Sequence, residues 1–93
     1  MREKTIEAQI VKAVEARGGI CPKWVGWNGC PDRIVLFPFA RIGFIEVKAP
    51  GEKPRPLQES RHRILRGLGF RVYVVDGTDQ IGPVLDEIGG KNG

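Results

Sequence analysis

The chain between residues 32 and 48 reads DRIVLFPFARIGFIEVK. Two runs rich in β-branched and aromatic residues, near 32–37 and 42–48, flank the segment 38–41, which has the length of a hairpin connection. The pattern predicts two antiparallel strands that lie side by side. In such a hairpin the start of the first strand lies opposite the end of the second.

This hairpin would gather three charged side chains. Glu46 and Lys48 share one face of the second strand because side chains alternate along a strand, and antiparallel pairing brings Asp32 beside them. Two carboxylates can hold a hard divalent cation, which can help to hydrolyse a phosphodiester, while Lys48 holds or activates the attacking water or binds the phosphate. The alternative is that Glu46 and Lys48 form an ordinary ion pair.

A helix over about residues 4–17 carries an acid on its apolar side. Glu7 lies among the apolar residues that form a stripe along this helix, so its carboxylate needs a partner. A metal ion or Lys48 would be a functional partner. The alternative is that Glu7 lies at the rim and reaches water. The stripe consists of Ile6, Ile10, Val11 and Val14.

A second helix is expected from Pro56 to Gly67 or Gly69. Gln58 follows the strand that carries Glu46 and could reach the same site, although a glutamine in a first turn is often only solvated. The predicted apolar face of this helix consists of Leu57, Ile64, Leu65 and Leu68.

Together these residues resemble a known family. The order Glu7, Gly29-Cys30-Pro31-Asp32, Glu46-Val47-Lys48, then Gln58 with Leu65 seven residues on, resembles the VRR-NUC (virus-type replication-repair nuclease) branch of the PD-(D/E)XK superfamily. The resemblance covers nearly the whole chain, and the combination is far more specific than an E-x-K motif alone.

The resemblance implies an α/β fold with a mixed sheet flanked by helices, and a DNA endonuclease that depends on Mg²⁺ or Mn²⁺. Stand-alone members of viral or bacterial origin are similar in size and are expected to act as homodimers on branched DNA such as four-way (Holliday) junctions. By carry-over, the metal ligands are Asp32, Glu46 and the Val47 backbone carbonyl, the catalytic lysine is Lys48, the supporting acid and candidate further ligand is Glu7, and the motif glutamine is Gln58.

The charge distribution agrees with a nucleic-acid partner. The chain has 93 residues and a net charge of +4. Between Lys48 and Arg71 there are seven Lys or Arg against two Glu, directly after the proposed catalytic strand. Such a segment would bind phosphates, although a charge run is often only a solvated helix face. The candidate DNA-binding residues are Lys53, Arg55, Arg61, Arg63 and Arg66.

The length predicts one domain, residues 1–88, followed by a flexible tail over 89–93. Further elements are expected as a strand near 20–25, a strand over 71–75 and a last helix from 78 or 79 to 88, which gives the order αβββαβα. Two cysteines and one histidine support neither a zinc site nor a disulfide scaffold. No stretch has the length and apolar character of a membrane span or a secretory signal, so a cytoplasmic protein is expected.

The aromatic residues leave two questions open. Trp24 and Trp27 could stack on bases, form a dimer contact or pack in the core. Phe37-Pro38-Phe39, near the hairpin tip, is a hypothetical dimer surface. Two other functions also remain open, a non-catalytic DNA-binding or assembly module on the same fold and a restriction-type endonuclease.

Overall fold

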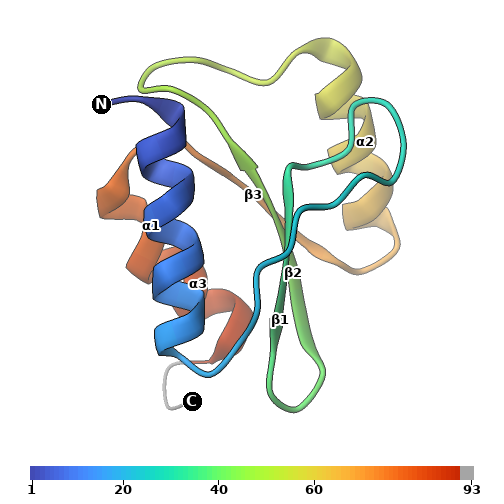
Figure 1. The fold of residues 1–93 in the computed structure, drawn as a ribbon. Coiled ribbons are helices and arrows are strands. Elements are labelled where there is room, and N and C mark those ends of the chain that lie inside the picture. Colours follow the sequence, from blue (N-terminus) through green and yellow to red (C-terminus); the bar gives the residue numbers. More distant parts are fainter. Residues whose placement is uncertain (91–93) are drawn as a thin grey trace.

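A three-stranded sheet separates two layers of helix (Figure 1). The strands β1 (Arg33–Phe37), β2 (Arg41–Val47) and β3 (Arg71–Val75) lie in that order, with β1 antiparallel and β3 parallel to β2. The predicted hairpin and mixed sheet are therefore confirmed. The structure, a computed structural model, describes residues 1–90, so residues 91–93 of the predicted tail lie outside the described part.

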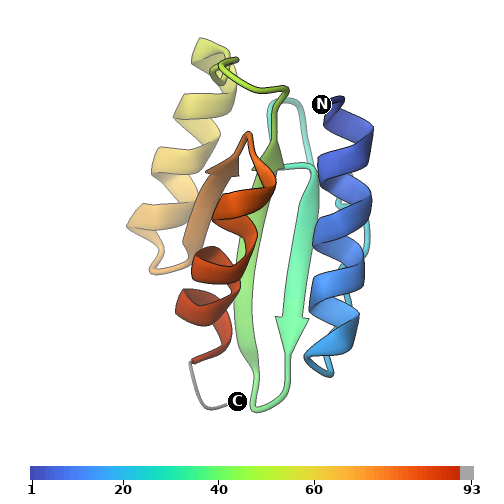
Figure 2. The same ribbon diagram turned by 90° about the vertical axis from the view of Figure 1, so that its left-hand side faces the viewer.

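The helices cover the two faces of the sheet unequally. The helices α1 (Glu3–Ala16) and α3 (Ile81–Gly89) lie on one face, and α2 (Pro56–Gly67) lies on the other (Figure 2). A short 3₁₀ turn, Thr78–Gln80, precedes α3. The last helix ends at Gly89, one residue later than predicted. No helix within residues 1–90 has the length and apolar character needed to cross a bilayer.

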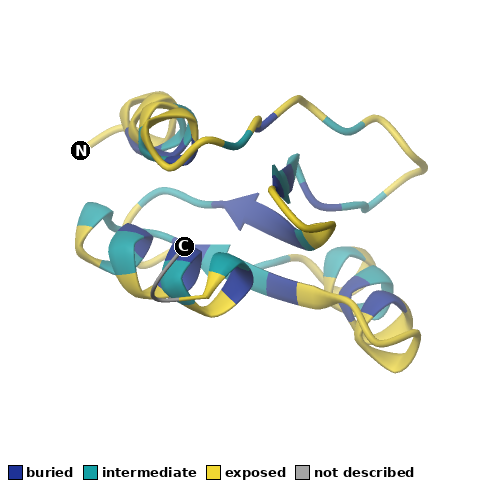
Figure 3. Ribbon diagram, turned by 90° about the horizontal axis from the view of Figure 1, so that it is seen from below, coloured by how far each residue is buried: buried dark blue, intermediate teal, exposed yellow. Residues whose placement is uncertain are grey.

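The larger core lies between the sheet and the pair α1 and α3. Ile45 and Val47 of β2 point into it, since alternate residues of a strand face the same side. Gly43 shares this face, and a Cβ there would collide with the side chain of Ile88. Buried residues are concentrated on the sheet and on the helix sides that face it (Figure 3). The other fully buried members include Ile6, Ile10, Val14, Val35, Val75 and Leu85.

A smaller core lies under α2, and here the predicted apolar face of the helix is largely wrong. Of the four predicted residues only Leu65 is buried, while Leu57, Ile64 and Leu68 are exposed. The second buried residue of α2 is His62, because the helix turns a polar side as well as Leu65 toward β2. Polar groups on β2 therefore decide which side of α2 faces the sheet.

The segment predicted as a strand near 20–25 forms only two isolated bridges to β1, Ile20 with Leu36 and Lys23 with Arg33. Pro22 lies between them and has no N–H to donate, although its carbonyl accepts a hydrogen bond from Ile34. The segment thus lies along the edge of β1 without becoming a regular fourth strand.

The hairpin between β1 and β2 closes through residues 38–40 with an unusual backbone. Phe39 and Ala40 have φ values of 67° and 59°, in the left-handed region that residues with a Cβ rarely adopt. Phe39 is 89% exposed, whereas Phe37 is buried against the core. The tip lies at the opposite end of the molecule from the N-terminus of α1 (Figure 1).

Candidate active site

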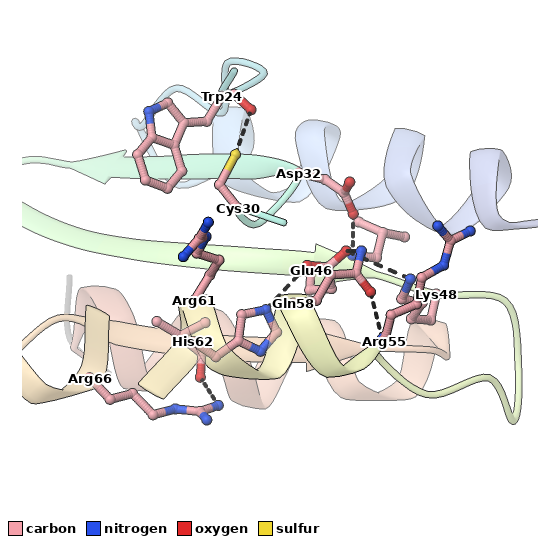
Figure 4. A network of polar contacts seen from close by, with 12 residues as sticks. Trp24, Cys30, Asp32, Glu46, Lys48, Arg55, Gln58, Arg61, His62 and Arg66 are labelled. Carbon is pink, nitrogen blue, oxygen red and sulfur yellow. Dashed lines mark hydrogen bonds and ion pairs between the residues drawn. The ribbon is translucent and has the colours of Figure 1, made fainter. Parts of the chain in front are cut away.

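Asp32, Glu46 and Lys48 meet at the end of β2, beside the first turns of α2 (Figure 4). The antiparallel register places the residue before β1 opposite Glu46. The Oδ2 atom of Asp32 accepts a hydrogen bond of 2.7 Å from the backbone N–H of Val47. The Nζ atom of Lys48 lies 3.8 Å from Oε2 of Glu46. The hairpin therefore brings together the three side chains that the sequence predicted to be neighbours.

Glu46 is the most buried charged side chain of this group, with 1% of its surface exposed. Its Oε2 atom accepts a hydrogen bond of 3.0 Å from Nε2 of Gln58, and its Oε1 atom lies 3.1 Å from Nε2 of His62. Burial raises the pKa of Glu46 to about 8, helped by the charge of Asp32 and a hydrogen bond to its side chain, against the opposing effect of Lys48. Without a bound cation, this environment favours a neutral carboxylic acid.

Gln58 reaches the site because the start of α2 fixes its amide. Its Oε1 atom accepts a hydrogen bond of 2.8 Å from the backbone N–H of Arg55, which directs the amide NH₂ group toward Glu46. Pro56 occupies the first helical position, where a missing N–H costs nothing. Gln58 is therefore not merely a solvated residue at a helix start, and its role in catalysis stays a prediction.

The structure gives Glu7 a different partner from the two predicted ones. Its Oε2 atom forms an ion pair of 2.8 Å with Nε of Arg33, whose guanidinium also donates to the backbone carbonyl of Cys21. Arg33 points to the α1 face of the sheet, whereas Glu46 points to the α2 face. Within residues 1–90 the partner of Glu7 is thus Arg33 and not the predicted Lys48, while a role of Glu7 as a supporting acid or metal ligand stays a prediction.

Two residues near the site were not among the predicted ones. His62 contacts Glu46 directly. Its sequence position could have identified it, because residues four apart in a helix, such as Gln58 and His62, lie on the same side. Glu3, in the first turn of α1, is the acid of this helix whose charge helps to raise the Glu46 pKa. No periodicity argument could have distinguished Glu3, because it lies on the exposed side of α1.

The predicted DNA-binding residues fall into two groups. Arg61 donates to the Asn28 carbonyl at 2.7 Å, and its guanidinium lies 4.9 Å from the centroid of the Trp27 ring. Arg66 donates to the Val72 carbonyl at 2.7 Å. These two arginines therefore have structural contacts. The side chains of Lys53, Arg55 and Arg63 form no ion pair within residues 1–90.

The rings of Trp24 and Trp27 pack edge to face, with centroids 5.9 Å apart, but the two residues differ in burial. Trp24 packs against Phe44, with ring centroids 4.7 Å apart, and belongs to the smaller core. Trp27 is 40% exposed at the loop that leads to Asp32. Core packing is therefore confirmed for Trp24, and contact with a base remains open for Trp27.

Asp32 and Glu46 form a donor set that suits a hard divalent cation. Both supply carboxylate oxygens on one face of the hairpin, and the charge of Asp32 helps to raise the Glu46 pKa. A bound Mg²⁺ or Mn²⁺ would relieve this repulsion, so the residues present fit such an ion. Within residues 1–90 no three His, Cys, Asp or Glu side chains are grouped around a common ion position. Further ligands would come from backbone, water and substrate phosphate, as Mg²⁺ commonly uses.

Comparison with known proteins identifies the family. A solved structure described as a "VRR_NUC domain" matches with a TM-score of 0.82 and 31% sequence identity, over 90% of this chain and 94% of the other. The chain belongs to the VRR-NUC family. This VRR-NUC chain is also 47% identical over 81 residues to "Putative nuclease p44" of Acyrthosiphon pisum secondary endosymbiont phage 1. The match covers 85% of this chain and 87% of that protein. No protein-family model matches the sequence.

Proposed function

We propose that this VRR-NUC chain is a metal-dependent endonuclease that hydrolyses phosphodiester bonds in branched DNA, such as four-way junctions, and acts as a homodimer. The observation that carries the proposal is the convergence of Asp32, Glu46 and Lys48 at the end of β2. Burial of Glu46 beside a second carboxylate is costly for a module that only binds DNA, because no metal ion would then offset the repulsion that Lys48 leaves.

The proposed roles follow from the contacts. Asp32 and Glu46, with the backbone carbonyl of Val47, would hold Mg²⁺ or Mn²⁺. A divalent ion supplies Lewis acidity to the phosphoryl group and to the attacking water. Lys48 offers three N–H donors, with which it orients that water or binds a phosphate oxygen. Gln58 holds the Glu46 carboxylate from α2.

The basic segment that follows β2 supplies the proposed DNA contacts. Lys53 and Arg55 lie in the connection between β2 and α2, and Arg63 lies on the exposed side of α2. Their cationic groups can bind phosphates on either side of the cleaved bond, which gives affinity that falls with salt and does not depend on sequence. Phosphate contacts of this kind respond to the shape of branched DNA and not to its base sequence.

A homodimer would give the second cut that opposing strands of a junction require. Among the exposed apolar residues within 1–90, the tip residue Phe39 or the side of α2 with Leu57, Ile64 and Leu68 could form its interface. Sedimentation of wild type, Phe39→Ser and Leu68→Ser would assign the interface, with dissociation expected for the tip variant. We place this activity in the cytoplasm of a bacterial host.

Cleavage of labelled DNA tests the function. A four-way junction, a flap and a plain duplex of equal length would be incubated with wild type or Asp32→Asn in Mg²⁺, Mn²⁺ or EDTA. We expect cutting that needs the ion, is lost in the variant and is fastest on the junction. Preference for one duplex sequence would instead indicate a restriction-type enzyme. Binding without cutting under every metal condition would overturn the nuclease and favour the DNA-binding module.

A further inference from the structure

His62 is a polar side chain in a buried position, where its burial costs free energy unless a hydrogen bond compensates for it. It is 2% exposed on the inner side of α2, and its only side-chain hydrogen bond within residues 1–90 is the 3.1 Å contact with Oε1 of Glu46. An apolar residue would fill the same position without the cost of burying an imidazole. The contact with Glu46 is therefore the feature that distinguishes this position (Figure 4).

Two α2 residues one turn apart bind the two oxygens of the same carboxylate. Gln58 donates to Oε2 at 3.0 Å, and His62 contacts Oε1 at 3.1 Å. The last torsion of a glutamate joins an sp³ to an sp² carbon and has no sharp minimum, so rotamer preference alone does not fix the carboxylate plane. A contact at each oxygen does fix it, and α2 supplies both.

The charge state of the imidazole suits this contact. Burial, and then the positive charge of Arg66, lower the pKa of His62, which favours the neutral ring. An ionised carboxylate only accepts hydrogen bonds, so a neutral His62 can bind ionised Glu46 only as the tautomer that carries hydrogen on Nε2. Such a donor holds the carboxylate without adding a positive charge that would compete with a bound cation.

We propose that His62 is a positioning residue that holds Oε1 of Glu46 and thereby sets the affinity of the site for a divalent ion. With 2% of its surface exposed, His62 acts through Glu46 and not by contact with the substrate. This inference rests on the proposed function in one respect, namely that Glu46 is a metal ligand. Partners that orient a metal ligand typically contribute about 10–100-fold to metal affinity.

Binding of Mn²⁺ to the protein without DNA, followed by electron paramagnetic resonance, provides the test. His62→Gln keeps an N–H donor close to the position of Nε2, whereas His62→Leu removes the donor with little change in volume. We expect His62→Leu to bind Mn²⁺ about 10–100-fold more weakly and His62→Gln to stay close to wild type. Saturating Mn²⁺ should then restore most of the cleavage rate of His62→Leu. A purely structural role would lower the melting temperature in EDTA and leave the affinity unchanged.

A folded His62→Leu protein with wild-type Mn²⁺ affinity would overturn the inference. If His62→Leu does not fold, ¹⁵N NMR of the wild-type imidazole in saturating Mg²⁺ decides, since the proposal requires hydrogen on Nε2 and a hydrogen on Nδ1 alone contradicts it. The two levels of failure differ. If only the inference about His62 is wrong, the wild-type protein still binds the divalent ion and cuts DNA. If the wild-type protein binds no divalent ion, the proposed function itself is refuted.

Discussion

Replacing Glu46 by glutamine should make the metal-free protein more stable at neutral and alkaline pH. In the wild type, folding moves this carboxyl from water into a site where it is 1% exposed and next to Asp32. The glutamine side chain would have nearly the same shape and no charge. Its amide oxygen can accept from Gln58, and its NH₂ can donate to a neutral His62, so both contacts have counterparts in the variant.

The magnitude follows from the pKa of Glu46, which folding raises from 4.5 to about 8. The folded state then binds the proton more tightly than the unfolded state, so this stability is fully present below pH 4.5 and is lost as the pH rises through 8. Between pH 4 and pH 7 the loss is about 3 kcal/mol for a single group with these two pKa values. An amide at this position does not titrate, so the variant should not show this loss.

Urea unfolding in EDTA, repeated from pH 4 to pH 9, measures the effect. The free energies of the two proteins should converge near pH 4 and differ by about 3 kcal/mol at pH 7. Glu52→Gln, at an exposed position in the same region, is the matched control and should follow the wild-type profile. Addition of Mg²⁺ should stabilise wild type and not Glu46→Gln. Parallel pH profiles for wild type and Glu46→Gln would refute the reasoning, since they would show that folding does not perturb this carboxyl.

Three further predictions concern the neighbouring residues. Lys48→Ala should abolish turnover and largely retain DNA binding, because the Lys48 amine lies beside the Glu46 carboxylate while other cationic side chains supply the phosphate contacts. Near-normal single-turnover cutting by this variant would show that Lys48 has no role in the mechanism. Glu7→Gln should lower the free energy of unfolding by about 1 kcal/mol, because its bond to Arg33 is weakened, and should cut DNA at close to the wild-type rate. A large loss of cutting at unchanged stability would instead show that Glu7 takes part in catalysis. Arg63→Ala should weaken binding equally on all DNA sequences and reduce the slope of log affinity against log salt by about one, and an unchanged slope would exclude a phosphate contact.

The central part of the site could be predicted because it is local in sequence. Asp32, Glu46 and Lys48 belong to one hairpin, whose strand alternation and short connection follow from a few consecutive residues. Glu7 shows where such reasoning stops. Helical periodicity correctly identified a carboxylate near the core, but its partner Arg33 lies 26 residues away in sequence, on a strand face that periodicity could not assign to α1.

The orientation of α2 could not be predicted for a different reason. Counting apolar residues favours the side with Leu57, Ile64 and Leu68, yet the structure exposes it. Gln58 and His62 bind the buried Glu46 carboxylate, and leaving that carboxylate unpaired would cost more than exposing three aliphatic side chains. A helix beside a buried charge is thus oriented by the charge.

The left-handed backbone at Phe39 and Ala40 has an evolutionary consequence. Asn-Gly would adopt these angles with little strain, whereas two residues with a Cβ each cost roughly 1 kcal/mol or more there. Random substitution would therefore often find a more stable turn, and selection for stability alone would not keep an aromatic ring at this place. Replacing residues 39–40 by Asn-Gly should therefore stabilise the turn, and any activity or assembly lost at the same time would be assigned to the exposed Phe39 ring.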